Sequence, residues 1–270
     1  MEQSKKFISP GAWFSMLYPA SWNEFEGGEE SFLFYNPDKW TGNFRISAYR
    51  GEHDSYGNES VKQELKDNSA AMKVKVGKLD CAYSKETFVE GEVEYCAHLW
   101  VVGIDDIAFE CSFITDTEHP DDTEAREVIA SLEVRNAQIK YPAEIIPVRL
   151  SEIYQIDESF EWMSSVIKDQ LKKDFQGVEG DIENIQKVID AGSLSPKKRE
   201  PWISIGIVLC VILTNEVDGF QWRTLIDGNR QAPVLLNETT GTWIDPMKLA
   251  WSKVKAGQQV DLAETYAGLI

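Results

Sequence analysis

Three consecutive β-rich runs, separated only by short turn segments, constrain the first half of the chain most strongly. They cover Lys78 to Val89, Glu92 to Val102 and Asp106 to Thr115. Gly91 separates the first two runs, and the corner from Gly103 to Asp106 separates the last two. Connections this short join antiparallel neighbours, because parallel strands need a long crossover. The sequence therefore predicts an antiparallel meander.

Shorter elements complete the expected first domain, residues 1–138, as an antiparallel sheet with packed helices. Pro19 ends the first strand, since proline cannot donate to a strand ladder. The first helix is expected from Asn58 to Met72, with Val61 and Leu65 on the same face as Met72. The other expected elements are strands at 12–18, 31–35 and 43–49, a helix from 122 through 129, and an extended segment at 132–135.

A linker at residues 139–150 is predicted from its prolines, Pro142 and Pro147, and from the lack of helical periodicity. We expect a second, helix-rich α+β domain at 151–270 with a small β-hairpin. Asp157 is the expected cap of its first helix. The run from Trp202 to Leu213 is apolar on all sides but too short to span a bilayer, so it predicts the central core helix.

Charge and composition exclude several classes of function. The chain of 270 residues carries 27 basic and 45 acidic side chains, a formal charge of -18. Such a surface repels nucleic-acid phosphates and anionic membranes, so neither is an expected partner. No signal peptide or membrane span is visible, and the 4 cysteines have neither disulfide-framework nor zinc spacing. We expect a soluble cytoplasmic protein with reduced thiols. The sequence has no glycine-rich phosphate loop, so we expect no cofactor.

A Tyr-Pro-x-x-Trp signature lies in the segment from Phe14 to Trp22. Aromatic Phe32 and Phe34 follow, then the turn Asn36-Pro37 and the segment Arg45 to Ser47. This order resembles the PsbP-like (Mog/PsbP) family. The resemblance implies an antiparallel sheet with packed helices and the role of a non-catalytic accessory or protein-binding module. Some members of that family are secreted or lipid-anchored, whereas this sequence shows no lipobox cysteine.

The second half resembles a small bacterial α+β domain of unknown function. The residues that carry this resemblance are Gly206 in the apolar helix, Trp222, the turn Asp227-Gly228, and Pro246 at the start of a late helix. It implies a fold but no reaction.

His98 and Cys111 are candidate catalytic partners on neighbouring strands. With a two-residue turn, Cys96, His98 and Trp100 share a face with Cys111, and thiol and imidazole could act as nucleophile and base. With an odd-numbered loop, His98 points to the other face. Buried cysteines usually act as small hydrophobic residues, and no oxyanion motif accompanies the pair. We therefore expect no catalytic dyad.

A metal site is the weak alternative for the acidic segment 116–124. Its candidate ligands are Asp116, Glu118, His119 and Asp121, but their spacing does not match a calcium loop. Acidic residues before a helix also complement its positive N-terminus, and Asp121 and Glu124 have capping-box spacing. We therefore expect no metal.

A binding site for a ligand or partner is predicted at the hairpin of the second domain. This is where aromatic, basic and turn residues gather, in loops that typically carry binding residues. The candidates are Trp243, Arg223, Arg230, Asp227 and Asn229.

Together these observations predict a non-catalytic, cytoplasmic protein that binds another protein, in an accessory or immunity-type role toward a partner with a basic surface. The alternative is a small-ligand-binding or hydrolase-like protein. Its site would be the His98/Cys111 face or a groove between the domains.

Overall fold

The computed structural model describes residues 3–27, 30–136 and 138–270. The chain divides into two compact units, Met1–Pro142 and Ala143–Ile270. Each unit combines antiparallel strands with helices, so the predicted α+β fold class is confirmed. Within these residue ranges, no helix has the length and apolar character needed to cross a membrane.

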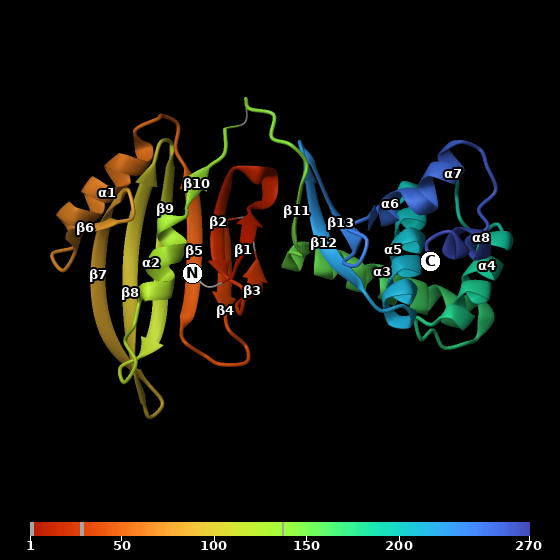
Figure 1. Cartoon of the computed structure of the whole chain (residues 1–270), viewed down its shortest axis with the longest axis horizontal. Helices are drawn as coiled ribbons and strands as arrows, with labels where there is room; N and C mark the ends of the chain where they lie inside the picture. The colour runs from red at the N-terminus through yellow and green to blue at the C-terminus, as the bar shows by residue number, and fades with distance from the viewer. Residues whose placement is uncertain (1–2, 28–29, 137) are drawn as a thin grey trace. The chain divides into compact units, whose positions relative to one another are not determined.

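The first unit is built on a large antiparallel sheet with the strand order β3-β4-β5-β9-β8-β7-β6. The predicted meander is confirmed, because β7, β8 and β9 are sequential neighbours, and Figure 1 shows them as long strands. The strands are β3 (Asn23–Gly27), β4 (Ser31–Tyr35), β5 (Asn43–Arg50), β6 (Met72–Val76), β7 (Leu79–Glu90), β8 (Val93–Ile104) and β9 (Ile107–Asp116).

A smaller sheet in the first unit joins β1 (Ser4–Ile8), β2 (Phe14–Pro19) and β10 (Glu133–Val134), with a short 3-10 turn, η1 (Pro10–Ala12), before β2. Phenylalanines of this sheet pack against the large one: the rings of Phe14 and Phe109 lie 5.2 Å apart, edge to face. Trp22, just after β2, is fully buried and stacks on Phe113 at 5.8 Å. Burying such aromatic side chains removes large apolar areas from water and supplies most of the stabilisation of this core.

Two helices cover opposite faces of the large sheet. The side chain of Asn68, just beyond α1 (Tyr56–Asp67), donates to Ser84 on β7. Asp122, which precedes α2 (Thr123–Ala130), pairs with His98 on β8. Ser84 lies opposite Leu99, one position beyond His98, and successive side chains of a strand point to opposite faces. The inner face, under α2, therefore carries the main core, and the outer face carries α1.

The helix expected over 58–72 ends earlier than predicted. It closes at Asp67, because Asn68 takes an extended conformation and its side-chain oxygen accepts from the backbone N–H of Ala70. Met72 instead begins β6 and is largely exposed, so its prediction as a helix-face residue is wrong. Asn68 competes with the helix through its own side-chain hydrogen bonds, as asparagine commonly does.

The second unit packs helices on one antiparallel sheet in the order β11-β12-β13-β14. The central helix α5 is buried along most of its length, as its apolar sequence predicts. The strands are β11 (Glu144–Pro147), β12 (Phe220–Asp227), β13 (Arg230–Asn237) and β14 (Trp243–Ile244). The helical segments are α3 (Leu150–Leu171), η2 (Glu179–Asp181), α4 (Ile182–Asp190), α5 (Arg199–Glu216), α6 (Pro246–Leu249), α7 (Trp251–Lys255) and α8 (Leu262–Ala267).

Helix α3 starts at Leu150, so Asp157 lies inside it and does not cap it. A buried ion pair fixes the earlier start: the guanidinium of Arg149 donates to both oxygens of Glu152, at 2.9 and 2.6 Å. The hydroxyl of Thr224 on β12 also donates to Glu152, at 3.0 Å. Within the segment expected as linker, residues 144–147 form β11 and pair with β12.

Candidate functional site

The β8–β9 hairpin places His98 on the inner face of the large sheet. Its register pairs Ile104 with Ile107, so the connection is the two-residue turn Asp105-Asp106. Of the two alternatives that the sequence leaves open, this is the one in which His98 shares a face with Cys111. Cys111 lies opposite Trp100, however, and the thiol that contacts the imidazole is that of Cys96.

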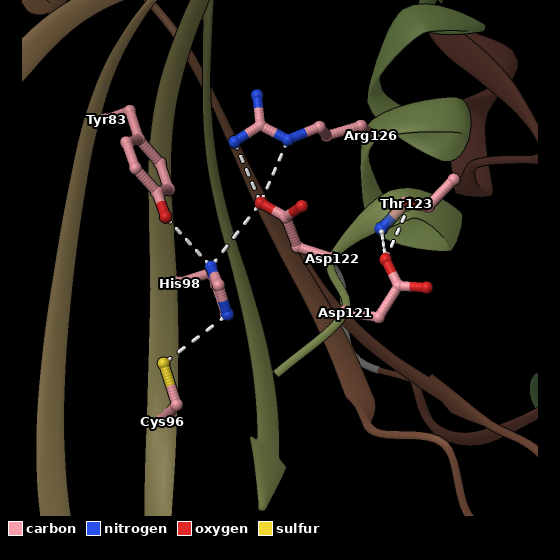
Figure 2. A network of polar contacts seen from close by, with 7 residues as sticks. All are labelled: Tyr83, Cys96, His98, Asp121, Asp122, Thr123 and Arg126. Carbon is pink, nitrogen blue, oxygen red and sulfur yellow. Dashed lines mark hydrogen bonds and ion pairs between the residues drawn. The ribbon is translucent and has the colours of Figure 1, made fainter. Parts of the chain in front are cut away.

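Figure 2 shows a polar network around His98. Its Nδ1 lies 2.9 Å from the hydroxyl of Tyr83 and 3.4 Å from a carboxylate oxygen of Asp122, and its Nε2 lies 3.4 Å from the sulfur of Cys96. Arg126 donates to the same Asp122 oxygen through Nε at 2.9 Å and Nη2 at 2.8 Å. These residues come from β7, β8 and the start of α2, so the network ties the helix to the sheet.

The surroundings of His98 favour a neutral imidazole. Burial lowers the pKa of His98, and the charges of Lys85 and Arg126 act in the same direction, while Asp122 opposes them. A neutral ring with its proton on Nδ1 donates to the hydroxyl of Tyr83 and accepts from the thiol of Cys96 through Nε2. Both nitrogens are then used without burying a new charge.

The order thiol, imidazole, carboxylate is that of a nucleophile with its base and orienting group. Here it lacks access, because Cys96 is 1% and His98 is 3% exposed. Arg126 further covers the network, with its guanidinium 5.2 Å from the ring centre of Tyr83 and 5.7 Å from that of Trp100. The contacts fit a role in holding α2 on the sheet better than a role in attacking a substrate.

The candidate metal ligands are occupied by the loop before α2. One oxygen of Asp116 accepts from the backbone N–H of His119 at 2.7 Å and pairs with its ring at 3.1 Å. Asp121 accepts from the backbone and hydroxyl of Thr123, and these hydrogen bonds lower the pKa of Asp121. Glu118 is exposed, and among the described residues no group of three or more such side chains has metal-binding geometry.

Asp121 and Glu124 do not form the predicted capping box. The carboxylate of Glu124 instead accepts from the hydroxyl of Thr41 at 2.9 Å, which links α2 to the loop between β4 and β5. The acidic residues therefore shape this loop and hold it against its neighbour.

An exposed group of side chains on the outer face was not found from the sequence. We call it the aromatic surface; it consists of Trp40, Phe88, Val93 and Tyr95. Phe88 and Tyr95 are opposite each other on β7 and β8, and their rings stack at 5.5 Å. Trp40 meets Tyr95 edge to face at 6.3 Å, is 41% exposed, and donates through Nε1 to the side chain of Asn43 at 2.7 Å.

A hollow of about 650 Å³ adjoins Trp40. Four carboxylates line it against two basic side chains, Lys39 and His119, so its walls carry excess negative charge; the acidic residues are Asp116, Asp121, Glu124 and Glu127. The sequence signal that could have revealed this region is a tryptophan in a turn-rich segment, Asn36 to Gly42, where a large aromatic side chain has no strand to pack on.

The predicted site in the second unit is divided by the geometry of its hairpin. Trp243 is 43% exposed on β14 and lies beside Leu236, whereas Asp227, Asn229 and Arg230 lie at the turn. On β12, the residue opposite Leu236 is Gln221, and Asp227 lies six positions further along the strand, roughly 20 Å away at the rise of an extended strand. The candidate group is therefore not one site.

Carboxylate partners engage both arginines of that predicted site. Arg223 pairs with Glu238 at 2.9 Å, and Arg230 pairs with Asp245 at 2.5 Å. The expected groove between the domains stays a prediction.

Among solved structures, the chain is similar over nearly its whole length to a crystal structure from Bacteroides thetaiotaomicron VPI-5482. It is 62% identical, with a TM-score of 0.95, and the match covers 99% of this chain and 98% of that one. No curated protein matches the chain.

Two weaker matches cover half of this chain. The solution structure of cyanobacterial PsbP (CyanoP) from Synechocystis sp. PCC 6803 is 11% identical with a TM-score of 0.27, covering 50% of this chain and 94% of that one. The crystal structure of LpqN, involved in cell envelope biogenesis of Mycobacterium tuberculosis, is 13% identical with a TM-score of 0.30, covering 50% and 91%. At TM-scores below 0.5, neither match supports an argument about the fold or the function of this chain.

Two family models match along the chain. Residues 2–157 match the Domain of unknown function (DUF3805), and residues 181–266 match the Domain of unknown function (DUF3806). Since the first model spans more than half of the 270 residues, the chain belongs to the family described as Domain of unknown function (DUF3805).

Proposed function

We propose that this chain is a non-catalytic, cytoplasmic protein that binds a basic segment of another protein through the aromatic surface. The observation that carries the proposal is that the exposed Trp40 contacts Tyr95, which in turn stacks on Phe88. The free thiols of the 4 cysteines agree with a reducing compartment.

Exposed aromatic side chains in mutual contact are typical of binding surfaces. They bury large areas when a partner arrives, and they lose little conformational entropy because their neighbours already hold them. Trp40 is held by its hydrogen bond to Asn43 as well as by Tyr95. A partner would therefore meet a surface that is already arranged.

Charge favours a basic partner for this surface. On the outer face, Glu86 lies opposite Ala97, Glu90 opposite Val93, and Asp116 opposite Tyr95. Carboxylates thus alternate with the aromatic side chains, and the net charge of -18 attracts basic partners over longer range. A lysine or arginine side chain can also lie over an exposed indole ring, which adds a cation–π attraction.

A capture experiment with matched variants tests this function. The wild-type chain, a Trp40→Ala/Phe88→Ala variant and a Trp243→Ala variant are used to capture partners from native host lysate at low and high salt. We expect one stoichiometric partner that high salt weakens, that the double substitution loses, and that Trp243→Ala keeps. Synthetic segments of that partner then locate the binding sequence, which we expect to be rich in lysine or arginine.

Two results would contradict the proposal. One is a partner that remains bound after loss of Trp40 and Phe88, and the other is a partner that only Trp243→Ala removes. The second result would restore the hairpin site predicted from the sequence.

The competing role is a small-ligand-binding or hydrolase-like protein, and one observation favours it: the Cys96, His98 and Asp122 side chains lie in the order of a catalytic relay. That role requires a thiol that reacts in the folded chain. Rapid alkylation of Cys96 near neutral pH, absent in a His98→Gln variant, would support it.

A further inference from the structure

A second hollow, of about 600 Å³, lies in the second unit between α4, the segment 259–261 and α8. Its volume is in the range of small-molecule sites. Its apolar lining side chains include the buried Ile182 and Val260 and the exposed Ala263 and Ala267. The hollow therefore offers an apolar surface that an aliphatic ligand could cover.

Tyr266, on α8, lines this hollow and has an unsatisfied hydroxyl. The residue is only 4% exposed, and its hydroxyl finds no hydrogen-bond partner in the part of the chain that the structure describes. A buried hydroxyl without a partner costs free energy and usually marks a missing water or ligand. Burial and then the charges of Glu179 and Glu216 raise the pKa of Tyr266, so its oxygen stays a neutral phenol that can accept as well as donate.

The charged residues that line the hollow are all acidic. They are Glu179, Glu183, Asp190 and Asp261, and no lysine or arginine lines the hollow in the described chain. Lys187 pairs with Glu183, and Asp261 accepts from the N–H of Glu264. Even with those partners the rim keeps excess negative charge, which repels anions and attracts a cation.

We propose that this hollow binds a small organic ammonium ion with an aliphatic body. The aliphatic part covers the apolar lining, including Ala263 and Ala267, and the ammonium group donates to the rim carboxylates and to the hydroxyl of Tyr266. A neutral alcohol of the same length would keep the apolar contact but lose the charge-assisted hydrogen bonds, which are the stronger kind. This site is independent of the aromatic surface and of the proposed function.

Isothermal titration calorimetry of the full chain with hexylammonium chloride tests the site, with 1-hexanol and sodium hexanoate as matched probes. The variants are Tyr266→Phe, which removes only the hydroxyl, and Glu179→Gln, which removes one rim charge. Glu30→Gln is the control, because it removes the same charge from an exposed position in the first unit. Circular dichroism confirms that each variant is folded.

We expect saturable one-to-one binding of hexylammonium, weakened about fivefold by Tyr266→Phe and by Glu179→Gln. Glu30→Gln should keep the wild-type affinity, 1-hexanol should bind at least about tenfold more weakly, and hexanoate should not bind. The proposal is overturned if hexylammonium gives no saturable binding, if 1-hexanol binds equally well, or if either hollow variant keeps the wild-type affinity.

Discussion

Acidification should destabilise the first unit through His98. Burial lowers the pKa of this imidazole from 6.5, so the unfolded chain takes up the proton more readily than the folded one. The stability that the neutral ring provides is complete above pH 6.5 and is lost as the pH falls through that value, down to the folded pKa. The loss has a ceiling, reached if the folded ring stays neutral throughout, of about 1.3 kcal/mol between about pH 7.5 and about pH 5.5.

The groups that face His98 come from both strands and from α2. Lys85 and Tyr83 lie on β7, and Cys96 lies beside the ring on β8. Asp122 directly precedes α2, and Arg126 lies within it. Asp122 alone would favour the protonated ring, but its charge is shared with Arg126, whose guanidinium donates two hydrogen bonds to it. Burial together with the two cations therefore outweighs the carboxylate.

Urea denaturation at the two pH values, compared between variants, isolates this effect from the many carboxylates of the chain. His98→Gln should lose less stability on acidification than the wild type, by up to about 1.3 kcal/mol. His119→Gln is the matched control, because it makes the same substitution at an exposed ring outside the network around His98. Equal losses in all three proteins would refute the reasoning.

Three further perturbations test the packing of the two units. Gly206→Ala would place a methyl against the carbonyl oxygen of Pro246 at the start of α6. Although alanine favours a helix, this clash should lower the free energy of unfolding by about 1–3 kcal/mol in urea denaturation. Gly180→Ala is the control, because nothing lies within 4 Å of the added methyl, and it should not lower the free energy of unfolding. Glu152→Gln breaks a buried ion pair and should cost about 3 kcal/mol by the same assay, whereas Glu183→Gln, in a surface pair, should leave the midpoint unchanged. The cysteines should resist a thiol reagent at pH about 8 until urea unfolds the chain, since all are buried and burial raises the pKa of Cys81 to about 11; fast labelling of the folded chain would contradict this.

The elements that could be predicted from the sequence are those whose pattern is local. The meander over β7 to β9 follows from alternating side chains and short turns, and the core position of α5 follows from its apolar run. The errors lie where a tertiary contact overrides the local pattern. Asn68 ends α1 through contacts with its own turn and with Ser84 on the neighbouring strand β7. The pair Arg149–Glu152 starts α3 seven residues before Asp157.

The candidate sites were harder to predict because they depend on distances across the sheet. The sequence showed that His98 could meet a thiol, but only the register shows that the thiol belongs to Cys96 and that both are buried. In the second unit, the sequence grouped Trp243 with Asp227, but the strand register places these two residues at opposite ends of the hairpin. The aromatic surface needed Trp40 to be placed beside Tyr95, more than fifty positions away in the chain.

The turn between β8 and β9 determines which residues of the segment Tyr95 to His98 face the core and which face outward. Because the turn has two residues, His98 faces α2 and Tyr95 faces outward. One more residue, taken up by sliding β8 one position along β9, would exchange these faces: His98 would be exposed and Tyr95 would enter the core. Asp105 permits the short turn by adopting a φ of 51°, a left-handed conformation that aspartate tolerates better than most residues. The division between a buried polar network and an exposed aromatic surface therefore depends on the turn and not on the residue types alone.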